Sequence, residues 1–471
     1  MIGRIPNCGH GQRPSAAPVP ASVPVPASAS AWLASLLLAV ALAGCARDPK
    51  PLPAGPWRAA LELPGGELPF GLEVAPAPPG AKAHPPVYLL NGPDRVEIDE
   101  VTVAGNRVTM LMPGFKNRID ATLEGDVLRG TLTMVKAGAK EQQIPFTARR
   151  GQTWRFSPPE AAADTPGVAQ PDPAAAQQAP ATATPQPGAT PPPTGGNVTG
   201  RWAVTFVADG KATEAVGEFV QQGTEVTGTF LTPTGDHRYL AGEFRGGTLR
   251  LSKFDGGHPF LYQAKLAEDG TLSGTYWSGL AYQETFSAHR DEKASLGEAE
   301  NATQMKQGAT ALDFRFPDLG GVYVSLSDPF YAGKVVVVTL AGSWCPNCHD
   351  EAAFLAPLYR EYHSQGFEVI ALMFEQFGDF DRAAEATHRF RARYHIDYAT
   401  LIAGISDKDD AATRLPQLNG VFAFPTTIFI DRQGKVRRLH TGFSGPATGK
   451  HYETLTTDFR HTIDQLLAEP R

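Results

Sequence analysis

Hydrophobic residues follow two patterns along the 471-residue chain, and the first is the alternation of β-strands. Between residues 198 and 290, eight short runs such as GRWAVTFV and EVTGTFLT alternate apolar and polar side chains, with turn residues between them. Residues 46–156 show the same pattern, interrupted by Gly, Asn and Asp. Such spacing is typical of antiparallel meanders, so both stretches are predicted to be all-β modules, either barrels or sandwiches.

The two β stretches resemble each other locally. Each opens on a tryptophan, Trp57 or Trp202, and each later carries Ala-x-Leu, a turn, and a leucine two residues before a glycine, at 121–130 and 264–274. A duplicated module and shared turn chemistry both account for these matches. Neither stretch contains a sequence cluster of His, Cys or carboxylate residues, so the aromatic side chains are expected to fill the cores.

From residue 307 the pattern changes to alternating strands and helices. The runs KVVVVTL and FEVIALMF, at 334–340 and 367–374, are typical of strands buried on both faces of a sheet. Residues 307–471 are therefore predicted to fold as an α/β domain with a mixed sheet. Helical spacing of apolar residues and turn signals predict helices at 350–365, 381–394, 407–415 and 452–467, and strands at 424–431 and 435–439.

The candidate chemistry lies in WCPNCH at residues 344–349. Cys345 and Cys348 have the spacing of a redox-active dithiol, and His349 completes the spacing at which haem is attached in c-type cytochromes. The pair opens a helix, whose first-turn N–H groups and dipole stabilise a thiolate. Cys345, expected to lie nearest the solvent, is predicted to be the nucleophile with a lowered pKa, and Cys348 to resolve the mixed disulfide. Pro346 suits the first helical turn, where a backbone N–H has no helical partner.

Residues 307–468 resemble the membrane-anchored, extracytoplasmic thioredoxin-like thiol–disulfide oxidoreductases of the TlpA type. The resemblance rests on the valine-rich strand, on Trp344 with the dithiol, and on FPTTIFID at 424–431. It implies a thioredoxin fold and no cofactor or metal beyond the redox-active disulfide. It also implies a cis-proline, Pro425, that faces the dithiol between Phe424 and Thr426.

The family also carries an acidic residue three positions after the second cysteine, where this chain has Glu351. Glu351 is either a general base with a raised pKa, which accepts the proton of the resolving cysteine, or a first-turn acid favoured by the helix dipole. Three positions depart from the family. Thr339 stands where cytoplasmic thioredoxins bury an Asp, Phe424 is bulkier than usual before the cis-proline, and Ala353 replaces a common proline. These departures leave the substrate preference open.

Other interpretations of the cysteines are weaker in this context. Haem attachment needs a mostly helical wrapping and a distal ligand, whereas this motif follows a central strand. A structural zinc site lacks a second ligand pair. A peroxiredoxin-like peroxidase needs Thr-x-x-Cys, which Ser343 and Trp344 before the cysteine do not supply. His349 is then expected to be an exposed helix residue.

Residues 1–45 are predicted to be a long leader that ends in a lipoprotein signal. The apolar residues 31–44 fit the core of a signal peptide, and Leu-Ala-Gly before Cys45 resembles the lipobox of bacterial lipoproteins. The resemblance implies cleavage before Cys45 and lipid on its thiol; an ordinary signal with a chance cysteine is the alternative. Residues 157–197, rich in Pro and Ala, are predicted to be a disordered linker, and 291–306 a second linker.

The predicted function is a lipid-anchored cell-envelope thiol–disulfide oxidoreductase on the periplasmic side of a membrane. The residue directly after Cys45 is Ala46 and not an acidic residue, which resembles the outer-membrane sorting signal of Gram-negative lipoproteins. Uncharged Pro346 and Asn347 between the cysteines predict a reductant of envelope protein disulfides, which the resemblance extends to cytochrome c apoproteins. A membrane electron-donor protein would recharge it. The alternative is a binding or scaffold lipoprotein with a structural dithiol. The net charge of −7 without a basic run argues against nucleic acid.

Overall fold

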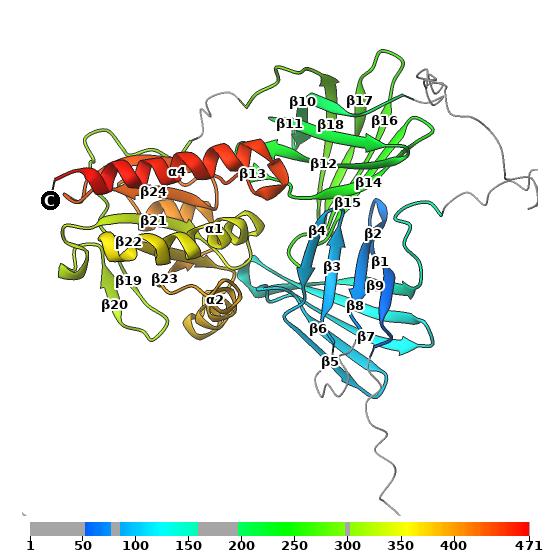
Figure 1. The fold of residues 1–471 in the computed structure, drawn as a ribbon, viewed down its shortest axis with the longest axis horizontal. Helices are drawn as coiled ribbons and strands as arrows, with labels where there is room; N and C mark the ends of the chain where they lie inside the picture. The colour runs from blue at the N-terminus through cyan, green and yellow to red at the C-terminus, as the bar shows by residue number, and fades with distance from the viewer. Residues whose placement is uncertain (1–51, 77–84, 159–195, 297–301, 471) are drawn as a thin grey trace, which may run out of the picture. The chain divides into compact units, whose positions relative to one another are not determined.

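The computed structural model describes residues 52–76, 85–158, 196–296 and 302–470. The predicted signal and Cys45 lie outside the described residues, as do most of the first predicted linker and part of the second. The described residues form two nine-stranded antiparallel sheets, a five-stranded mixed sheet and a two-stranded hairpin (Figure 1). These sheets form two all-β modules and a C-terminal α/β domain, which confirms the predicted fold class. Within these ranges, no helix is both long and apolar enough to cross a bilayer.

The first β module is an open antiparallel sheet with the strand order β4-β3-β2-β1-β9-β8-β7-β6-β5. No pairing joins β4 to β5 in the part of the chain that the structure describes, so this sheet does not close into a barrel. Its inward-facing side chains, among them Trp57, Phe70 and Phe146, are buried. The strands are β1 Gly55–Leu63, β2 Gly66–Val74, β3 Val87–Asn91, β4 Asp94–Glu97, β5 Glu100–Ala104, β6 Arg107–Leu111, β7 Arg118–Glu124, β8 Val127–Lys136 and β9 Lys140–Arg150.

The second β module is a closed barrel. Its strands follow the order β11-β10-β18-β17-β16-β15-β14-β12, and β12 pairs with β11 to complete the ring. Each of the eight predicted runs forms one barrel strand, and a two-residue strand, β13 Gly235–Asp236, is added beside β12. The barrel strands are β10 Gly200–Ala208, β11 Lys211–Gln222, β12 Glu225–Thr232, β14 Leu240–Arg245, β15 Thr248–Lys253, β16 Phe260–Leu266, β17 Leu272–Ser278 and β18 Tyr282–Arg290.

The repeated Ala-to-Gly pattern has the same structural cause in both β modules. Gly130 faces Ala121 across one hairpin, and Gly274 faces Ala264 across the other. A Cβ at Gly130 or Gly274 would lie 2.0 or 2.1 Å from a backbone oxygen of the facing strand. Only glycine fits so close to a neighbouring strand. Duplication of the module stays a hypothesis.

The loop between β15 and β16 of the barrel completes the core of the open sheet. Phe254 and Leu261 belong to the same buried cluster as the inward side chains of the first module. Asn91 donates a hydrogen bond to Phe254 O at 2.9 Å and accepts one from Phe254 N at 3.0 Å. Asn117 donates to Gly256 O at 2.8 Å. The open side of the first sheet is thus filled by the second module.

The C-terminal domain is built on the sheet β23-β22-β21-β24-β25. Strands β21, β22 and β23 run parallel, and β24 pairs antiparallel with β21. Every residue of β21, β22 and β24 is buried, which explains their continuous apolar sequences. This is the predicted thioredoxin fold. The strands are β21 Val335–Ala341, β22 Phe367–Glu375, β23 Ala399–Ile405, β24 Thr426–Ile430 and β25 Val436–Thr441, and a hairpin of β19 Arg315–Pro317 and β20 Tyr323–Ser325 precedes them.

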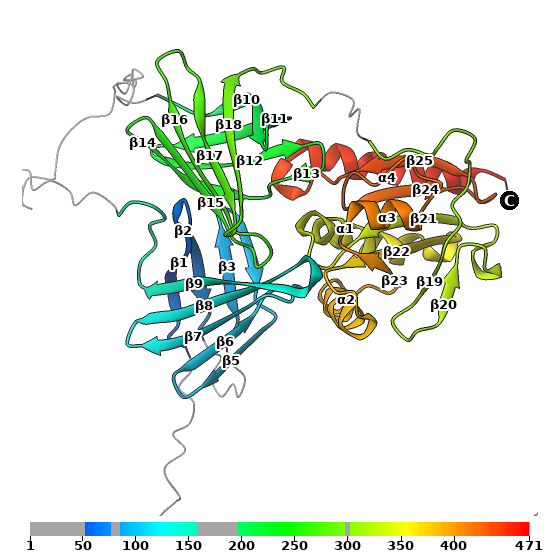
Figure 2. The ribbon, with the colours of Figure 1, turned by 180° about the vertical axis from the view of Figure 1, so that it is seen from behind.

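Helices cover both faces of the five-stranded sheet. In Figure 1, α1 and α4 lie in front of the sheet, and α3 comes into view from behind in Figure 2. Helix α1 begins at Pro346, four residues before the predicted start, because Cys345 caps it. The helices are α1 Pro346–Tyr362, α2 Phe380–Tyr394, α3 Lys408–Arg414 and α4 Lys450–Ala468; the short 3-10 turns are η1 Ala137–Ala139, η2 Pro329–Tyr331, η3 His363–Gln365 and η4 Pro446–Thr448.

Candidate active site

The dithiol lies at the junction of the central strand β21 and helix α1. Cys345 is the N-cap residue, and its Sγ accepts a hydrogen bond from Cys348 N at 3.2 Å. The two cysteines form a disulfide, with their Cα atoms 5.2 Å apart. After reduction, the same N–H group and the positive end of the helix dipole would stabilise a thiolate on Cys345. Of the two sulfur atoms, the one at Cys345 thus accepts a first-turn N–H group of α1.

The proline loop before β24 closes over the dithiol. The Phe424–Pro425 peptide bond is cis, as the resemblance implied. Phe424 O lies 3.2 Å from Cys345 Sγ. The Phe424 ring packs edge-on against Trp344, with centroids 5.7 Å apart, and Thr426 ties the loop down by donating to Ala423 O at 2.8 Å. The proline loop and the dithiol turn therefore support each other.

Glu351 is buried one helical turn beyond Cys348, on the same side of α1. It accepts hydrogen bonds from the hydroxyl groups of Thr339 on β21 and Thr427 on β24. Burial raises the pKa of Glu351 to about 7, while the two hydroxyl groups act in the opposite direction. Thr339, at the position where cytoplasmic thioredoxins bury an Asp, therefore holds a carboxylate that α1 supplies. The raised pKa suits proton transfer near neutral pH.

The expectation that His349 is exposed is wrong. Its side chain is 2% exposed and stacks on Phe115 of the first β module, with ring centroids 4.1 Å apart. Nε2 lies 2.8 Å from Ser343 O and Nδ1 lies 2.8 Å from the Tyr394 hydroxyl. Because a carbonyl only accepts, Nε2 carries the hydrogen and Nδ1 accepts from Tyr394. Burial lowers the pKa of His349 to about 3, so the imidazole is neutral and braces the turn before Cys345.

Cys345 also differs from expectation, because it is only 3% exposed. The loop around β13 of the barrel lies against the dithiol turn. Asn347, between the cysteines, donates hydrogen bonds from Nδ2 to Asp236 Oδ1 at 3.0 Å and to Asp236 O at 3.2 Å. Arg238 forms an ion pair of 2.8 Å with Asp350 of α1. No sequence motif indicates this contribution of the barrel.

A buried charge cluster supports Arg238 from the barrel side. Its guanidinium lies 2.7 Å from Asp255 Oδ2, which is also 2.9 Å from Lys253 Nζ. Burial raises the pKa of Asp350, although Arg238 opposes that shift. The same arginine and Lys253 hold the pKa of Asp255 below its ordinary value against the effect of burial. Arg238 and Asp350 are 112 residues apart in sequence, so local spacing gives no signal of their contact.

The match to a protein-family model falls on this C-terminal domain. The redoxin family model matches residues 306–455. The thiol–disulfide oxidoreductase ResA of Geobacillus thermodenitrificans is 33% identical over 140 residues, which cover 30% of this chain and 72% of that protein. The chain belongs to the family of these thiol–disulfide oxidoreductases. ResA of Bacillus subtilis is 28% identical over 138 residues, 29% of this chain and 69% of its own. A solved DsbF homologue from Corynebacterium diphtheriae matches at 20% identity and a TM-score of 0.28, over 36% of this chain and 98% of that one.

As a member of this family, the chain is a thiol–disulfide oxidoreductase. This membership favours disulfide exchange over haem attachment and over a purely structural dithiol. The matched family model begins at residue 306, so it does not cover the two β modules. Their contacts with the dithiol turn are a feature of this chain that the family model does not describe.

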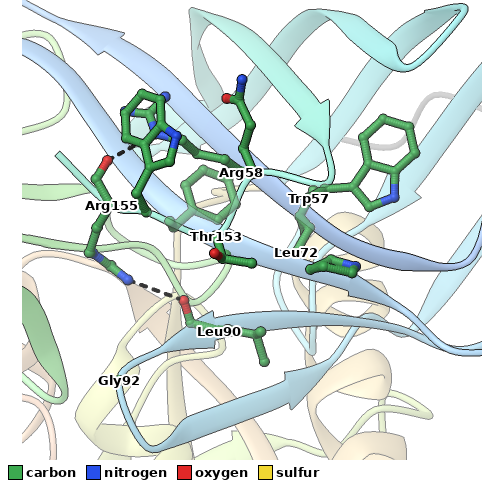
Figure 3. Close-up of a pocket in the computed structure, with 12 residues that line it drawn as sticks. Trp57, Arg58, Leu72, Leu90, Gly92, Thr153 and Arg155 are labelled. Carbon is green, nitrogen blue, oxygen red and sulfur yellow. Dashed lines mark hydrogen bonds between the residues drawn. The ribbon is translucent and has the colours of Figure 1, made fainter. Parts of the chain in front are cut away.

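A separate cavity of about 160 Å³ lies in the first β module (Figure 3). Trp57, Leu72 and Leu90 line it together with the arginines Arg58 and Arg155. Arg58 Nε donates to Arg155 O at 2.9 Å, and Arg155 NH1 lies 3.5 Å from Leu90 O. No cysteine, histidine or carboxylate belongs to the lining. We therefore assign the two arginines a structural role, in which their hydrogen bonds hold neighbouring segments of the module together, and no catalytic role.

Proposed function

We propose that this thiol–disulfide oxidoreductase is a cell-envelope reductant of protein disulfides that works through Cys345 and Cys348. The observation that supports it best is the capping geometry, in which Cys345 Sγ accepts the Cys348 N–H beside the cis-proline loop. Cys345 is the catalytic nucleophile and Cys348 the resolving thiol. Trp344, Phe424 and Thr426 position the two turns, and the reaction needs no cofactor beyond the redox-active disulfide.

The reaction proceeds in two balanced exchanges. The Cys345 thiolate attacks one sulfur of the substrate disulfide, whose S–S bond breaks and releases the other sulfur as a thiolate. Cys348 then loses its proton, for which Glu351 is the acceptor, and attacks Cys345 Sγ. The second substrate sulfur leaves as a thiolate, and the Cys345–Cys348 disulfide forms. Two electrons pass to the substrate, whose thiolates take up two protons.

The direction of electron flow follows from how far the thiolate is stabilised, since a stabilised reduced form makes a disulfide oxidising. Pro346 and Asn347 carry no charge, and Asn347 binds Asp236. The two barrel cations that line the pocket at Cys345, Arg238 and Lys253, are paired with Asp350 and Asp255. Little positive charge is therefore left to favour the thiolate beyond the helix terminus. We infer a reducing enzyme, recharged by a dithiol donor protein of the membrane, with cytochrome c apoproteins among its substrates.

Equilibration of the full chain with glutathione redox buffers tests the reducing direction. The expected midpoint is closer to about −270 mV than to about −120 mV, the two ends that thioredoxin and strong oxidants of this fold define. The oxidised fraction of the dithiol can be followed by alkylation and mass spectrometry. A midpoint near the oxidising end would contradict the proposal.

We further propose that lipid on Cys45 anchors the chain on the periplasmic side of a membrane, with the outer membrane favoured. Several acyl chains bind a bilayer stably, whereas one chain binds only marginally. A Cys45→Ser variant is expected to leave the membrane fraction, and wild type to incorporate labelled palmitate. Cys8 lies near the start of the predicted leader, and the Cys8→Ser variant serves as the control, which is expected to stay with the membranes. Recovery of the Cys45→Ser protein in the membrane fraction would refute the lipid anchor.

A further inference from the structure

The barrel loop of residues 232–238, here called the covering loop, closes the space in front of Cys345. It approaches the dithiol turn so closely that a Cβ on Gly235, which has φ +136°, would lie 2.8 Å from Asn347 Cγ. It also approaches the turn after β25, where a Cβ on Gly442 would lie 2.9 Å from Thr234 C. Asp236 Oδ1 accepts Gly445 N at 2.7 Å in the same region. The covering loop thus contacts the thioredoxin domain at two separate turns.

Buried charge holds the covering loop in this position. Arg238 adopts φ +56°, a conformation uncommon for a residue with a Cβ, and Asp236 Oδ2 accepts its backbone N–H at 2.8 Å. From there its guanidinium joins Asp350 of α1 to Asp255 of the barrel. A strained residue that is fixed by its surroundings often marks a functional element. Here the strained residue connects the barrel to the helix that carries the dithiol.

The space that remains at Cys345 is small. A pocket of about 230 Å³ is lined by the covering loop on one side and by Cys345, Pro346 and Phe424 on the other. Typical pockets for drug-sized ligands measure about 300–1,000 Å³. A pocket of this size holds at most part of a low-molecular-weight disulfide. A folded polypeptide would need the place next to the proline loop that the covering loop occupies.

We propose that the covering loop is a specificity filter, and that Asp236 and Arg238 are its specificity-determining residues. With the loop in place, Cys345 exchanges with low-molecular-weight disulfides, and protein disulfides reach it only when the loop moves away. The exchange is the balanced two-step reaction given above, with a small disulfide as the electron acceptor. This inference rests on the proposed function, because it assigns access to the same dithiol.

An Asp236→Ala/Arg238→Ala double variant of the full chain tests the filter. The rates of reduction of insulin and of oxidised glutathione are measured side by side with the reduced enzyme. The ratio of insulin rate to glutathione rate is expected to rise at least about tenfold in the variant, because the docked state of the loop loses its charged contacts. The matched control is Arg250→Ala, which removes a barrel arginine that pairs with Glu243 and does not line the pocket. Its ratio is expected to equal that of wild type.

A measurement on the unaltered chain keeps the filter testable if the double variant does not fold. Reduced wild type is alkylated with N-ethylmaleimide or with a 5-kDa polyethylene-glycol maleimide, and labelling is quantified on the Cys345 peptide. The quantity compared is the labelling rate of the large reagent divided by that of the small reagent. This ratio is expected to be at least about tenfold lower in the folded chain than in the denatured chain. Equal relative rates, or an unchanged substrate ratio in the folded double variant, would overturn the filter and leave the proposed function intact. Failure of every folded variant to reduce either disulfide would instead refute the proposed function.

Discussion

A Cys345→Ser variant is expected to lose disulfide reduction entirely, whereas Cys348→Ser retains the first attack and accumulates mixed disulfides. The reason is positional, because Cys345 caps α1 and accepts the Cys348 N–H, while Cys348 lies inside the helix and is 1% exposed. The loss in Cys345→Ser should reach the background rate, which means at least about 1,000-fold. Reduction of insulin measures the loss, and non-reducing electrophoresis of the full chain after incubation with a protein disulfide measures the trapping.

The double Cys345→Ser/Cys348→Ser variant is the control, and it should trap nothing. Treatment of the trapped species with a reductant should release the substrate and restore the free Cys345 thiol. Equal trapping by the two single variants would contradict the assignment of nucleophile and resolving thiol.

A Glu351→Gln variant is expected to slow the second exchange by about 100-fold, the lower part of the range for general acid–base catalysis. The carboxylate of Glu351 accepts the proton of Cys348 only when it is ionised, and its pKa is about 7. Resolution in wild type should therefore accelerate as the pH rises through 7, and this step in the profile should be absent from the variant. Single-turnover reaction of the reduced enzyme with a small disulfide, followed through Trp344 fluorescence, separates the second exchange from the first.

The same substitution is also expected to change how the free energy of unfolding depends on pH. A rise in pH should accelerate resolution in wild type but lower its stability. The carboxyl of Glu351 has a pKa raised from 4.5 to about 7 in the folded chain, so the unfolded chain loses its proton first as the pH rises. Wild type should lose unfolding free energy between pH 4.5 and 7, by about 3 kcal/mol when the shift is complete. Glu351→Gln should lack this loss, as denaturant titrations at pH 5 and 8 would show. Slow resolution together with an unchanged pH profile of stability would instead assign Glu351 a purely structural role.

The sequence predicted those features that depend on local periodicity. The apolar runs of β21, β22 and β24 and the helical spacing in α2 and α4 are visible in the chain because burial selects them residue by residue. The eight barrel strands were equally visible through their alternation. Barrel closure was not visible in the sequence. In the second module β12 pairs with β11, whereas β4 and β5 of the first module stay unpaired with each other. This difference depends on contacts between strands and not on the pattern within one strand.

The candidate site divides in the same way. Cys345 and Cys348 form a short motif whose chemistry can be read from its spacing, and the family resemblance implied the cis-proline Pro425. Asp236 and Arg238 gave no such signal, since they lie more than 100 residues before the cysteines and reach them only through the folding of the barrel. His349 was misplaced because its helical position alone does not reveal that Phe115 covers it. Surfaces made by separate modules are the part of a site that a local pattern does not contain.

The shared core of the two β modules bears on what the connection between them does. Phe254 of the barrel is fully buried among side chains of the open sheet, and Asn91 and Asn117 bind the backbone of the same loop. Covalent continuity through residues 159–195 is therefore not what keeps the modules together. A chain nicked by a protease within that stretch would remain associated as a two-fragment complex, with the Cys345 pocket still walled by the barrel. Either fragment produced alone would expose an apolar surface and would depend on the other for its solubility.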